Sequence, residues 1–186
     1  MIFFTADSHF GHKNILSHCR RPFSSLEEMD REMILRWNSR VSPEDEVYIL
    51  GDLMFSCKDP EHYLRQLSGR KHLILGNHDK VWMKRMDPAP YFESIQPLLE
   101  LKLEGVRLTL CHYPMMAWNE DRHGAYLIHG HIHNDTDLPF WPLLRENDHI
   151  LNAGVDLNGF TPVSFPELIV NNRIFKEASL SAKLPG

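Results

Sequence analysis

The sequence has few cysteines, and none of them belongs to a Cys-x-x-Cys pair. The three cysteines are widely separated, at Cys19, Cys57 and Cys111. Three cysteines without such a pair suggest neither a disulfide framework nor a zinc ribbon. The apolar start of the chain reaches Asp7 too soon, and without a preceding basic segment, to be a signal peptide. We therefore expect a reduced, cytoplasmic protein.

Long hydrophobic runs and long basic runs are also missing. No apolar stretch approaches the ~20 residues of a transmembrane helix, so no membrane partner is expected. The net charge is −5 with neutral histidines, and the pairs Arg20-Arg21 and Lys84-Arg85 are too short for the basic stripe of a nucleic-acid-binding protein. Nucleic acid is thus expected only as a possible substrate. The sequence leaves the oligomeric state open.

The overall composition is that of an ordinary globular domain. A length of 186 residues without internal repeats or linkers favours one domain spanning residues 1–186. The histidine content is unusual, because twelve histidines are present and several of them are clustered. Histidine is the commonest metal ligand and titrates near neutral pH. The clusters therefore predict a chemically active site.

The first half of the chain alternates strands with helices. Three strands are expected, over residues 1–6, 47–50 and 72–75. A helix is predicted over 26–40, because Ser25 and Glu28 form a capping box before apolar residues at helical spacing. A second helix is expected to begin with Pro60 at its first position and to end near Gly69.

The second half favours antiparallel strands. A hairpin is expected from strands 98–103 and 106–111 around a Glu-Gly turn, followed by strands at 125–128 and 149–152. Residues 134–147 are expected to form a loop. The stretch 168–175 either completes a second sheet or is helical, since Ser164 and Glu167 also fit a helix cap. The pattern predicts an α/β fold of two sheets packed face to face with helices outside.

Polar residues follow five of the expected strands. In layered α/β folds, ligands bind at the carboxyl ends of strands, where loops converge. Histidine is not a turn residue, so five such placements indicate a shared site rather than five unrelated turns. The residues are Asp7, His9, Asp52, Asn77, His78, His112, His131 and His133.

These residue types suit divalent transition metals. Oxygen and imidazole donors without a thiolate favour Mn, Fe, Zn, Co or Ni, and the sequence does not decide between them. Two cations ~4 Å apart repel strongly and need a shared anionic ligand. A carboxylate can bridge two ions, whereas a neutral imidazole cannot.

The ordered set Asp-x-His, Gly-Asp, Gly-Asn-His-Asp, His and Gly-His-x-His resembles the calcineurin-like metallophosphoesterase superfamily. It spans Asp7 to His133, about two thirds of the chain, and the segment 7–15 is similar to a compact bacterial and phage subgroup. The resemblance implies a four-layer α/β/β/α sandwich of two mixed sheets, with the metal site at the carboxyl ends of the strands.

The resemblance also implies a role for each motif residue. The first ion would be bound by Asp7, His9 and His133, and the second by Asn77, His112 and His131. Asp52 would bridge both ions. His78 would be a catalytic residue, facing the substrate as a general acid or electrostatic stabiliser.

The implied reaction is hydrolysis of a phosphate ester by a hydroxide that bridges two metal ions. We expect a phosphodiesterase or phosphatase acting on a small ester, nucleotide or cyclic nucleotide. The alternatives are a nuclease acting on nucleic-acid ends and a catalytically silent binding scaffold. After Asp52 the chain continues with Leu53-Met54-Phe55, without the Asp-Arg-Gly that protein Ser/Thr phosphatases of this superfamily carry. It thus lacks the arginine that would bind a phosphoprotein phosphate, so a protein phosphatase is disfavoured. It also lacks the aspartate that would orient His78, so the residue with that role is left open.

Three further residues are candidates for substrate binding. His12, Lys13 and Arg21 follow the first strand and its motif, and each could reach a substrate phosphate.

Overall fold

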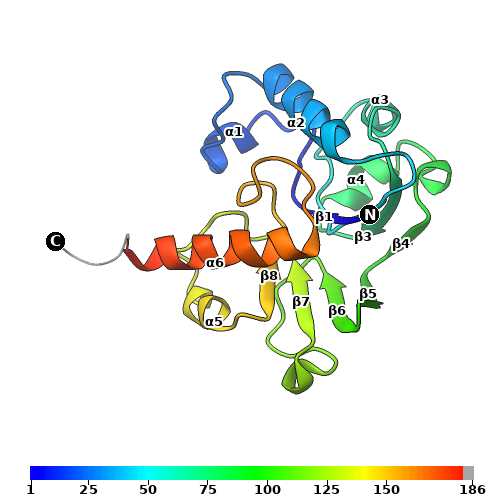
Figure 1. The fold of residues 1–186 in the computed structure, drawn as a ribbon. Coiled ribbons are helices and arrows are strands. Elements are labelled where there is room, and N and C mark those ends of the chain that lie inside the picture. Colours follow the sequence, from blue (N-terminus) through cyan, green and yellow to red (C-terminus); the bar gives the residue numbers. More distant parts are fainter. Residues whose placement is uncertain (182–186) are drawn as a thin grey trace.

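The computed structural model describes residues 1–181 and contains two four-stranded sheets (Figure 1). The strands of the first sheet, in spatial order, are β1 (Ile2–Thr5), β2 (Glu46–Ile49), β3 (Arg70–Ile74) and β4 (Ser94–Gln96). Those of the second are β5 (Leu98–Leu103), β6 (Val106–Cys111), β7 (Tyr126–His129) and β8 (Ile150–Asn152). All strand pairs of the first sheet are parallel, so the expectation that both sheets are mixed is wrong for this one.

The second sheet is mixed. Its β5–β6 hairpin is antiparallel as predicted, but β7 and β8 each join the sheet in parallel. The prediction of antiparallel strands after the hairpin is therefore wrong. Parallel neighbours begin at the same end of a sheet, so the chain must return to that end between them. The connections before β7 and β8 are long enough to do so. The carboxyl ends of β6, β7 and β8 consequently lie at one edge.

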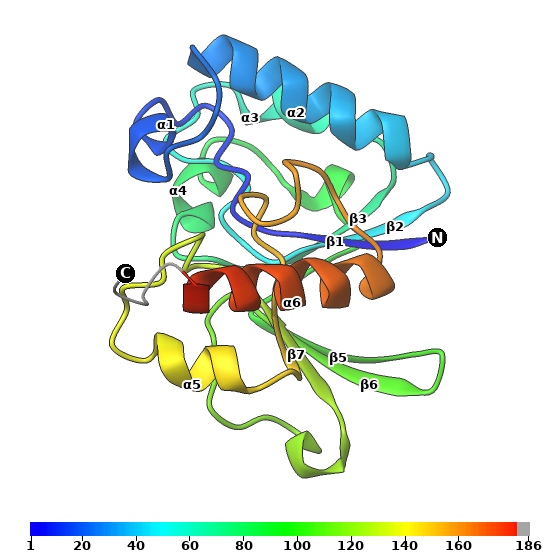
Figure 2. The same cartoon turned by 60° about the vertical axis from the view of Figure 1, so that its left-hand side comes forward.

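Side chains of alternate strand residues divide the core into layers. On β1, Phe3 packs under the helices of the first sheet and Phe4 packs between the two sheets. A third apolar cluster joins Leu127 of β7 to Trp141 on the outer face of the second sheet. These clusters separate four layers, so the expected α/β/β/α sandwich is confirmed (Figure 2).

The helices form the outer layers. The first sheet is covered by α2 (Leu26–Arg40), α3 (Pro60–Leu64) and α4 (Asp79–Met83), and the second by α5 (Trp141–Glu146). A short α1 (Ile15–His18) follows β1, and single 3₁₀ turns occupy Ala89–Tyr91 and Asp121–His123. The predicted capping box is present, because the Ser25 hydroxyl accepts a hydrogen bond from the Glu28 N–H. None of the helices within residues 1–181 is long and apolar enough to cross a membrane.

Short elements account for most of the wrong predictions. Helix α5 lies within the segment 134–147 that is predicted to be a loop, with Pro142 in its first turn, a position that tolerates proline. The sequence also did not predict α1, α4 and β4, which have only three to five residues each. Such lengths are too short to show a periodic pattern.

The last helix closes the open side of the sandwich. Residues 165–181 form α6, so the alternative of a closing strand is wrong. Helix α6 contacts both β1 and β8, which are edge strands of different sheets (Figure 1). Leu168 of α6 is fully buried in the core between the sheets, and the Lys176 ammonium donates hydrogen bonds to the carbonyls of Asn147 and Ile150.

Burial of Lys176 predicts a pH-dependent stability. Desolvation lowers the pKa of Lys176 from 10.5 to about 8. Between these pH values the unfolded chain holds the proton that the folded chain has lost, so the free energy of unfolding should rise with pH. Denaturant unfolding of metal-free protein at pH 7.5 and 9.5 measures this, with Lys176→Met as the comparison. The wild type should gain stability relative to the variant as pH rises, and a constant difference would contradict the prediction.

Candidate metal centre

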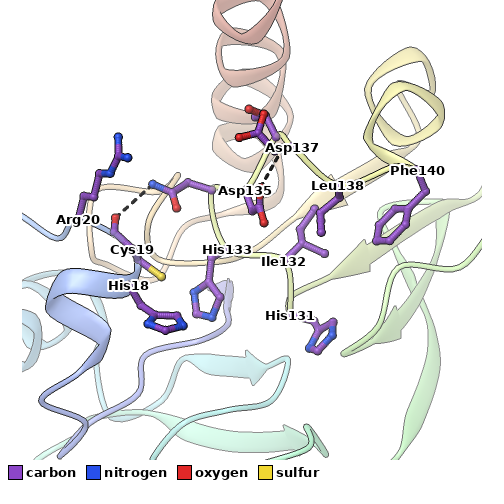
Figure 3. Close-up of a pocket in the computed structure, with 12 residues that line it drawn as sticks. His18, Cys19, Arg20, His131, Ile132, His133, Asp135, Asp137, Leu138 and Phe140 are labelled. Carbon is purple, nitrogen blue, oxygen red and sulfur yellow. Dashed lines mark hydrogen bonds between the residues drawn. The ribbon is translucent and has the colours of Figure 1, made fainter.

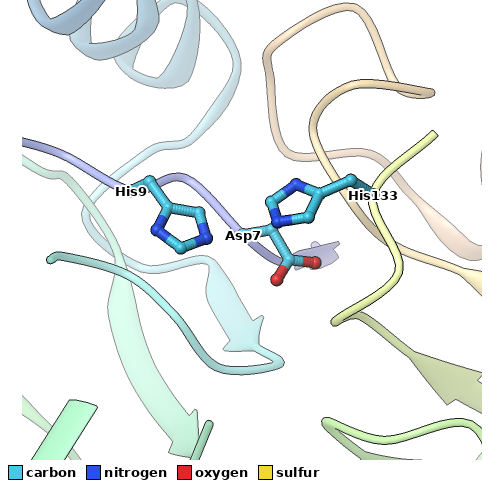
Figure 4. Close-up of side chains that lie close together, drawn as sticks. All are labelled: Asp7, His9 and His133. Atoms are coloured by element: carbon cyan, nitrogen blue, oxygen red, sulfur yellow. The ribbon is translucent and has the colours of Figure 1, made fainter. Parts of the chain in front are cut away.

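The predicted ligands converge where the strands of both sheets end. Donor atoms of Asp7, His9 and His133 lie within 4.8 Å of one another, and those of Asp7, Asp52 and His112 form a second group within the same limit. Figure 4 shows His9 and His133 pointing toward Asp7 from opposite sides. The first sheet supplies Asp7, His9 and Asp52, and the second supplies His112 and His133.

Asp52 lies at the centre of this cluster. Its Oδ2 atom is 3.7 Å from Nε2 of His9 and 3.6 Å from Nε2 of His112. The Nε2 atom of His112 is also 3.1 Å from Oδ1 of Asn77, and Nδ1 of the same ring is 2.8 Å from the Leu50 carbonyl oxygen. Asp52 thus stands between the two predicted ligand sets, the position that a bridging carboxylate requires.

His131 lies at the outer side of the cluster. Its backbone N–H donates a hydrogen bond of 2.9 Å to Oδ2 of Asp7, and its ring centroid is 5.1 Å from that of His112. Its side chain is more exposed than those of the other histidines that we predict as ligands. The structure therefore brings all seven predicted metal ligands into one cluster.

Several donor atoms of the cluster are buried without partners. Within residues 1–181, Oδ1 of Asp7 and both ring nitrogens of His9 have no hydrogen-bond partner. Burial raises the pKa of Asp7 to about 6, and burial together with nearby cationic groups strongly lowers the pKa of His9. Unpaired buried polar atoms are costly, and a divalent cation would satisfy them. This donor set fits a bound metal ion.

The backbone of the cluster is held in an uncommon conformation. Five of the seven predicted ligands have positive φ angles, in the left-handed region that most non-glycine residues avoid. Each costs on the order of 1 kcal/mol or more and persists only where the surroundings enforce it. The residues are Asp7 (57°), His9 (54°), Asp52 (52°), His131 (73°) and His133 (50°). Half of the ten non-glycine residues with positive φ angles in the described part of the chain are therefore proposed ligands.

Glycines make room for ligands that belong to other loops. A Cβ atom on Gly51 would collide with the His112 ring, and one on Gly76 would collide with the Asp52 carboxylate. A Cβ atom on Gly130 would lie 2.6 Å from Oδ2 of Asp7. In each of these three motifs a glycine is therefore required before the ligand, because a side chain from another loop comes too close for a Cβ atom.

Gly130→Ala is expected to weaken metal binding. The φ angle of Gly130 is not positive, so the effect comes from the clash with Asp7 rather than from the backbone. Overpacking of this kind costs about 1–3 kcal/mol. Calorimetric titration of metal-free protein with Mn²⁺ measures the affinity. The control is Gly105→Ala, in which the added Cβ atom meets open space but the positive φ angle of 91° strains the backbone, so it should lower stability without changing Mn²⁺ affinity. Similar Mn²⁺ affinities for the two variants would argue against a packing role for Gly130.

His78 differs from the buried ligands in its exposure. Its side chain is 34% exposed, whereas those of His9 and His112 are 3% and 0% exposed. Its backbone N–H donates to Oδ1 of Asp52, and its ring packs edge-on against Phe55 with centroids 4.6 Å apart. The His78 ring is therefore next to the cluster and open to the solvent, where a substrate would lie.

Asp79 organises the backbone beneath the cluster. Its fully buried carboxylate accepts hydrogen bonds from the N–H groups of Asp52, Leu53 and Gly76 and from the indole of Trp82. Burial raises its pKa although these donors stabilise the charge. All four of these hydrogen bonds come from groups other than the His78 ring. Its role is to join the loop after β2 to the loop after β3.

The predicted substrate-binding residues have different surroundings. The His12 ring lies 5.3 Å from the ring of His9 and 4.1 Å from that of Phe55, and burial lowers its pKa. Lys13 is exposed. Of the two, only His12 adjoins the cluster.

The prediction for Arg21 is corrected by the structure. Its guanidinium group is buried and donates hydrogen bonds to the carboxylate of Asp156 and to the backbone carbonyls of Asp7 and Ser8. These contacts occupy the donors that a substrate phosphate would need. Its place in the sequence, as the second residue of the short basic pair Arg20-Arg21, gave no sign of this burial.

Asp156 is a site residue that the sequence reasoning missed. It follows β8, as the other cluster residues follow their strands, so the same rule could have identified it. Oδ2 of Asp156 is 3.0 Å from Nδ1 of His133. Burial opposes a charge on His133, but its hydrogen bonds to Asp156 and Cys19 and the charge of Asp7 raise its pKa to about 10.

A cavity of about 550 Å³ adjoins the cluster on the side of His131 and His133 (Figure 3). His18 and Arg20 line one side, and Leu138 and Phe140 line the other. This volume falls within the range of small-molecule sites.

Comparison with known proteins identifies relatives over most of the chain. The chain is 35% identical to the uncharacterized protein MJ1445 of Methanocaldococcus jannaschii over 172 residues, covering 91% of this chain and 89% of that protein. It is 32% identical to the Gene 66 protein of Mycobacterium phage L5, covering 73% of this chain and 78% of the phage protein. No protein-family model matches the chain.

A solved structure of similar extent shows a similar fold. The protein of unknown function AQ665 from Aquifex aeolicus aligns with a TM-score of 0.69 at 28% identity, covering 90% of this chain and 96% of that one. YfcE, a phosphoesterase from E. coli, aligns with a TM-score of 0.40 at 20% identity, covering 82% of this chain and 77% of that one. The chain therefore belongs to the family of the M. jannaschii protein, and its ordered motifs, carried on two packed sheets, resemble those of the calcineurin-like metallophosphoesterase superfamily.

Proposed function

We propose that this protein is a dinuclear metal-dependent phosphoesterase that hydrolyses a small phosphate ester. The observation that carries the proposal is the convergence of three imidazoles on one carboxylate oxygen. The Nε2 atoms of His9, His78 and His112 lie 3.6–3.8 Å from Oδ2 of Asp52. An anionic oxygen in this position suits a site of concentrated positive charge.

The chain offers two ligand sets that share Asp52. Asp7, His9 and His133 would hold the first ion, and Asn77, His112 and His131 would hold the second. Mixed oxygen and imidazole donors favour Mn, Fe, Zn, Co or Ni. When bound, the two ions supply positive charge to the phosphate and lower the pKa of the attacking water. Support comes from the unpaired buried atoms of Asp7 and His9, which need a cation.

His78 acts on the leaving group. Its ring is open to the solvent, and its backbone N–H is hydrogen-bonded to Asp52, which keeps the ring beside the cluster. From there it stabilises or protonates the departing oxygen, a contribution that matters most for a poor alkoxide leaving group. His12 lies on the same side and is available to contact the substrate.

The substrate is a small ester, nucleotide or cyclic nucleotide. The cavity beside His131 and His133 has room for the remainder of such a molecule. The net charge of −5 and the burial of Arg21 leave few cations to bind a long nucleic acid. Neutralisation of many phosphates is what gives nucleic-acid binding its strength and its salt dependence.

The test compares a small aryl diester with a single-stranded oligonucleotide at matched phosphate concentration. Protein loaded with each candidate metal is assayed at about 50 and 200 mM salt, a range over which multi-phosphate binding weakens steeply. We expect turnover of the small ester to change little with salt and to exceed that of the oligonucleotide. A salt-sensitive preference for the oligonucleotide would favour a nuclease, and no turnover with any metal would favour a binding scaffold.

A further inference from the structure

A buried ion pair joins two loops at the metal centre. Nε and Nη2 of Arg21 lie 2.8 and 3.1 Å from the two carboxylate oxygens of Asp156. The Arg21 side chain is 0% exposed and that of Asp156 is 2% exposed. Two parallel hydrogen bonds from a guanidinium group fix the orientation of a carboxylate as well as its position.

Arg21 also binds the backbone of the first motif. Its Nη2 donates a 2.7 Å hydrogen bond to the Asp7 carbonyl, and its Nη1 donates a 2.8 Å hydrogen bond to the Ser8 carbonyl. Asp7 has a positive φ angle, so this contact helps to hold it in an unfavourable conformation. One guanidinium group thus connects the loop after β1 with the loop after β8.

Asp156 in turn contacts His133. Its Oδ2 atom lies 3.0 Å from Nδ1 of the imidazole. An ionised carboxylate can only accept a hydrogen bond, so Nδ1 carries the hydrogen in this contact. The other nitrogen, Nε2, is then the one available to bind a metal ion. Carboxylates that hold a ligand histidine in this way fix both its tautomer and its ring orientation.

We propose that Asp156, held by Arg21, is a positioning residue that directs Nε2 of His133 toward the first metal ion. This inference rests on the metal centre proposed above. Burial of the Arg21–Asp156 ion pair costs desolvation free energy, so stabilisation of the fold does not by itself explain the pair. A role in orienting His133 does explain it. It also gives Arg21 a role at the site without contact to the substrate.

A different arrangement of the same atoms is less consistent with the contacts. The Sγ atom of Cys19 lies within 4.8 Å of donor atoms of His133 and Asp156, so these three residues could form a separate metal site. Both oxygens of Asp156 already accept hydrogen bonds from Arg21, and Oδ2 also faces His133. A carboxylate engaged in this way is better suited to orient a ligand than to be one.

The first test is the variant Asp156→Asn, titrated with Mn²⁺ from the metal-free state in a calorimeter. We expect the wild type to bind two ions. In the variant, one of them should bind roughly 10–100-fold more weakly, the usual effect of removing a partner of a ligand histidine. The other ion should be affected less. Arg21→Lys keeps the positive charge but cannot contact both oxygens of Asp156, so it should weaken the same ion and provides a second measurement if Asp156→Asn folds poorly.

A double-mutant cycle separates positioning from general destabilisation. If Asp156 acts through His133, adding Asp156→Asn to His133→Ala should cause no further loss of Mn²⁺ affinity. The matched control is Glu167→Gln, which alters another arginine–carboxylate pair, with both oxygens of Glu167 at 2.7 Å from Nη2 of Arg40. The control should lower the melting temperature without changing Mn²⁺ affinity.

Three results would overturn the inference. The first is binding of both ions by Asp156→Asn as tightly as by the control, and the second is an effect of Asp156→Asn that adds fully to that of His133→Ala. An equal loss of affinity in Cys19→Ser and Asp156→Asn would instead make Asp156 a ligand of a separate site. Failure of the wild type to bind Mn²⁺ or Co²⁺ would overturn the metal centre itself, so the two failures are distinguishable.

Discussion

Asp52→Asn is expected to bind no more than one metal ion tightly and to lose most of its turnover. Two divalent ions ~4 Å apart repel by about 4 kcal/mol even at the dielectric constant of water, and by more inside a protein. A neutral amide removes the negative charge that offsets this repulsion. Removing one group that stabilises transition-state charge typically costs about 10²–10³-fold in turnover, and the loss of an ion should make the effect at least as large.

Elemental analysis after metal loading, together with turnover of an aryl phosphate ester, checks this expectation. The matched control is Asp45→Asn, because the Asp45 carboxylate binds the chain's amino terminus and the Ser42 N–H, away from the cluster. The control should retain two ions. A wild type that binds at most one ion under metal-replete conditions would contradict the bridging role of Asp52.

His78→Ala is expected to keep both ions and to lose turnover by about 10²–10⁴-fold, the range for general acid–base assistance. The ring is the most accessible of the three imidazoles around Asp52, so its removal should leave the ligands in place. An ester with a nitrophenolate leaving group needs little help with protonation. Its hydrolysis should therefore fall less than that of an alkyl ester.

The measurement is turnover of both esters together with metal content. His62→Ala is the control, because His62 is exposed on α3 and lies outside the motifs. Equal losses on the two esters would make His78 a phosphate-binding residue. Loss of an ion would make it a metal ligand.

The elements that the sequence predicted best have local signals. The helix at 26–40 is confirmed because its capping box and its apolar spacing both lie within the helix. The hairpin of β5 and β6 is confirmed over residues 98–103 and 106–111, because the turn between them fixes which residues pair. Both are determined by neighbours in the chain.

The wrong predictions concern features that depend on distant contacts. Whether β7 and β8 join in parallel is decided by the route of the chain across the sheet, which the strands themselves do not encode. The segment 168–175 has residues that suit a strand, but α6 is favoured where a helix can cover the edges of both sheets.

The candidate site shows the same contrast between features with a local sequence signal and features that depend on distant contacts. Its motif residues could be identified because each follows a strand, and strand ends meet at one edge. The role of Arg21 could not, because a surface arginine and a buried one have the same sequence context. Its burial depends on Asp156, which is 135 positions away. Similarly, the contact between Gly130 and Asp7 appears only after the two sheets have packed.

The division of the ligands between the two sheets links metal supply to folding. Each proposed ion has ligands from both sheets: His9 and His133 for the first ion, and Asn77 and His112 for the second. Such ions act as cross-links that the unfolded chain cannot maintain. Free metal at 100 times its dissociation constant would add about 2.7 kcal/mol to the free energy of unfolding. In a cell, the lifetime of this protein against proteolysis would then follow the concentration of free metal.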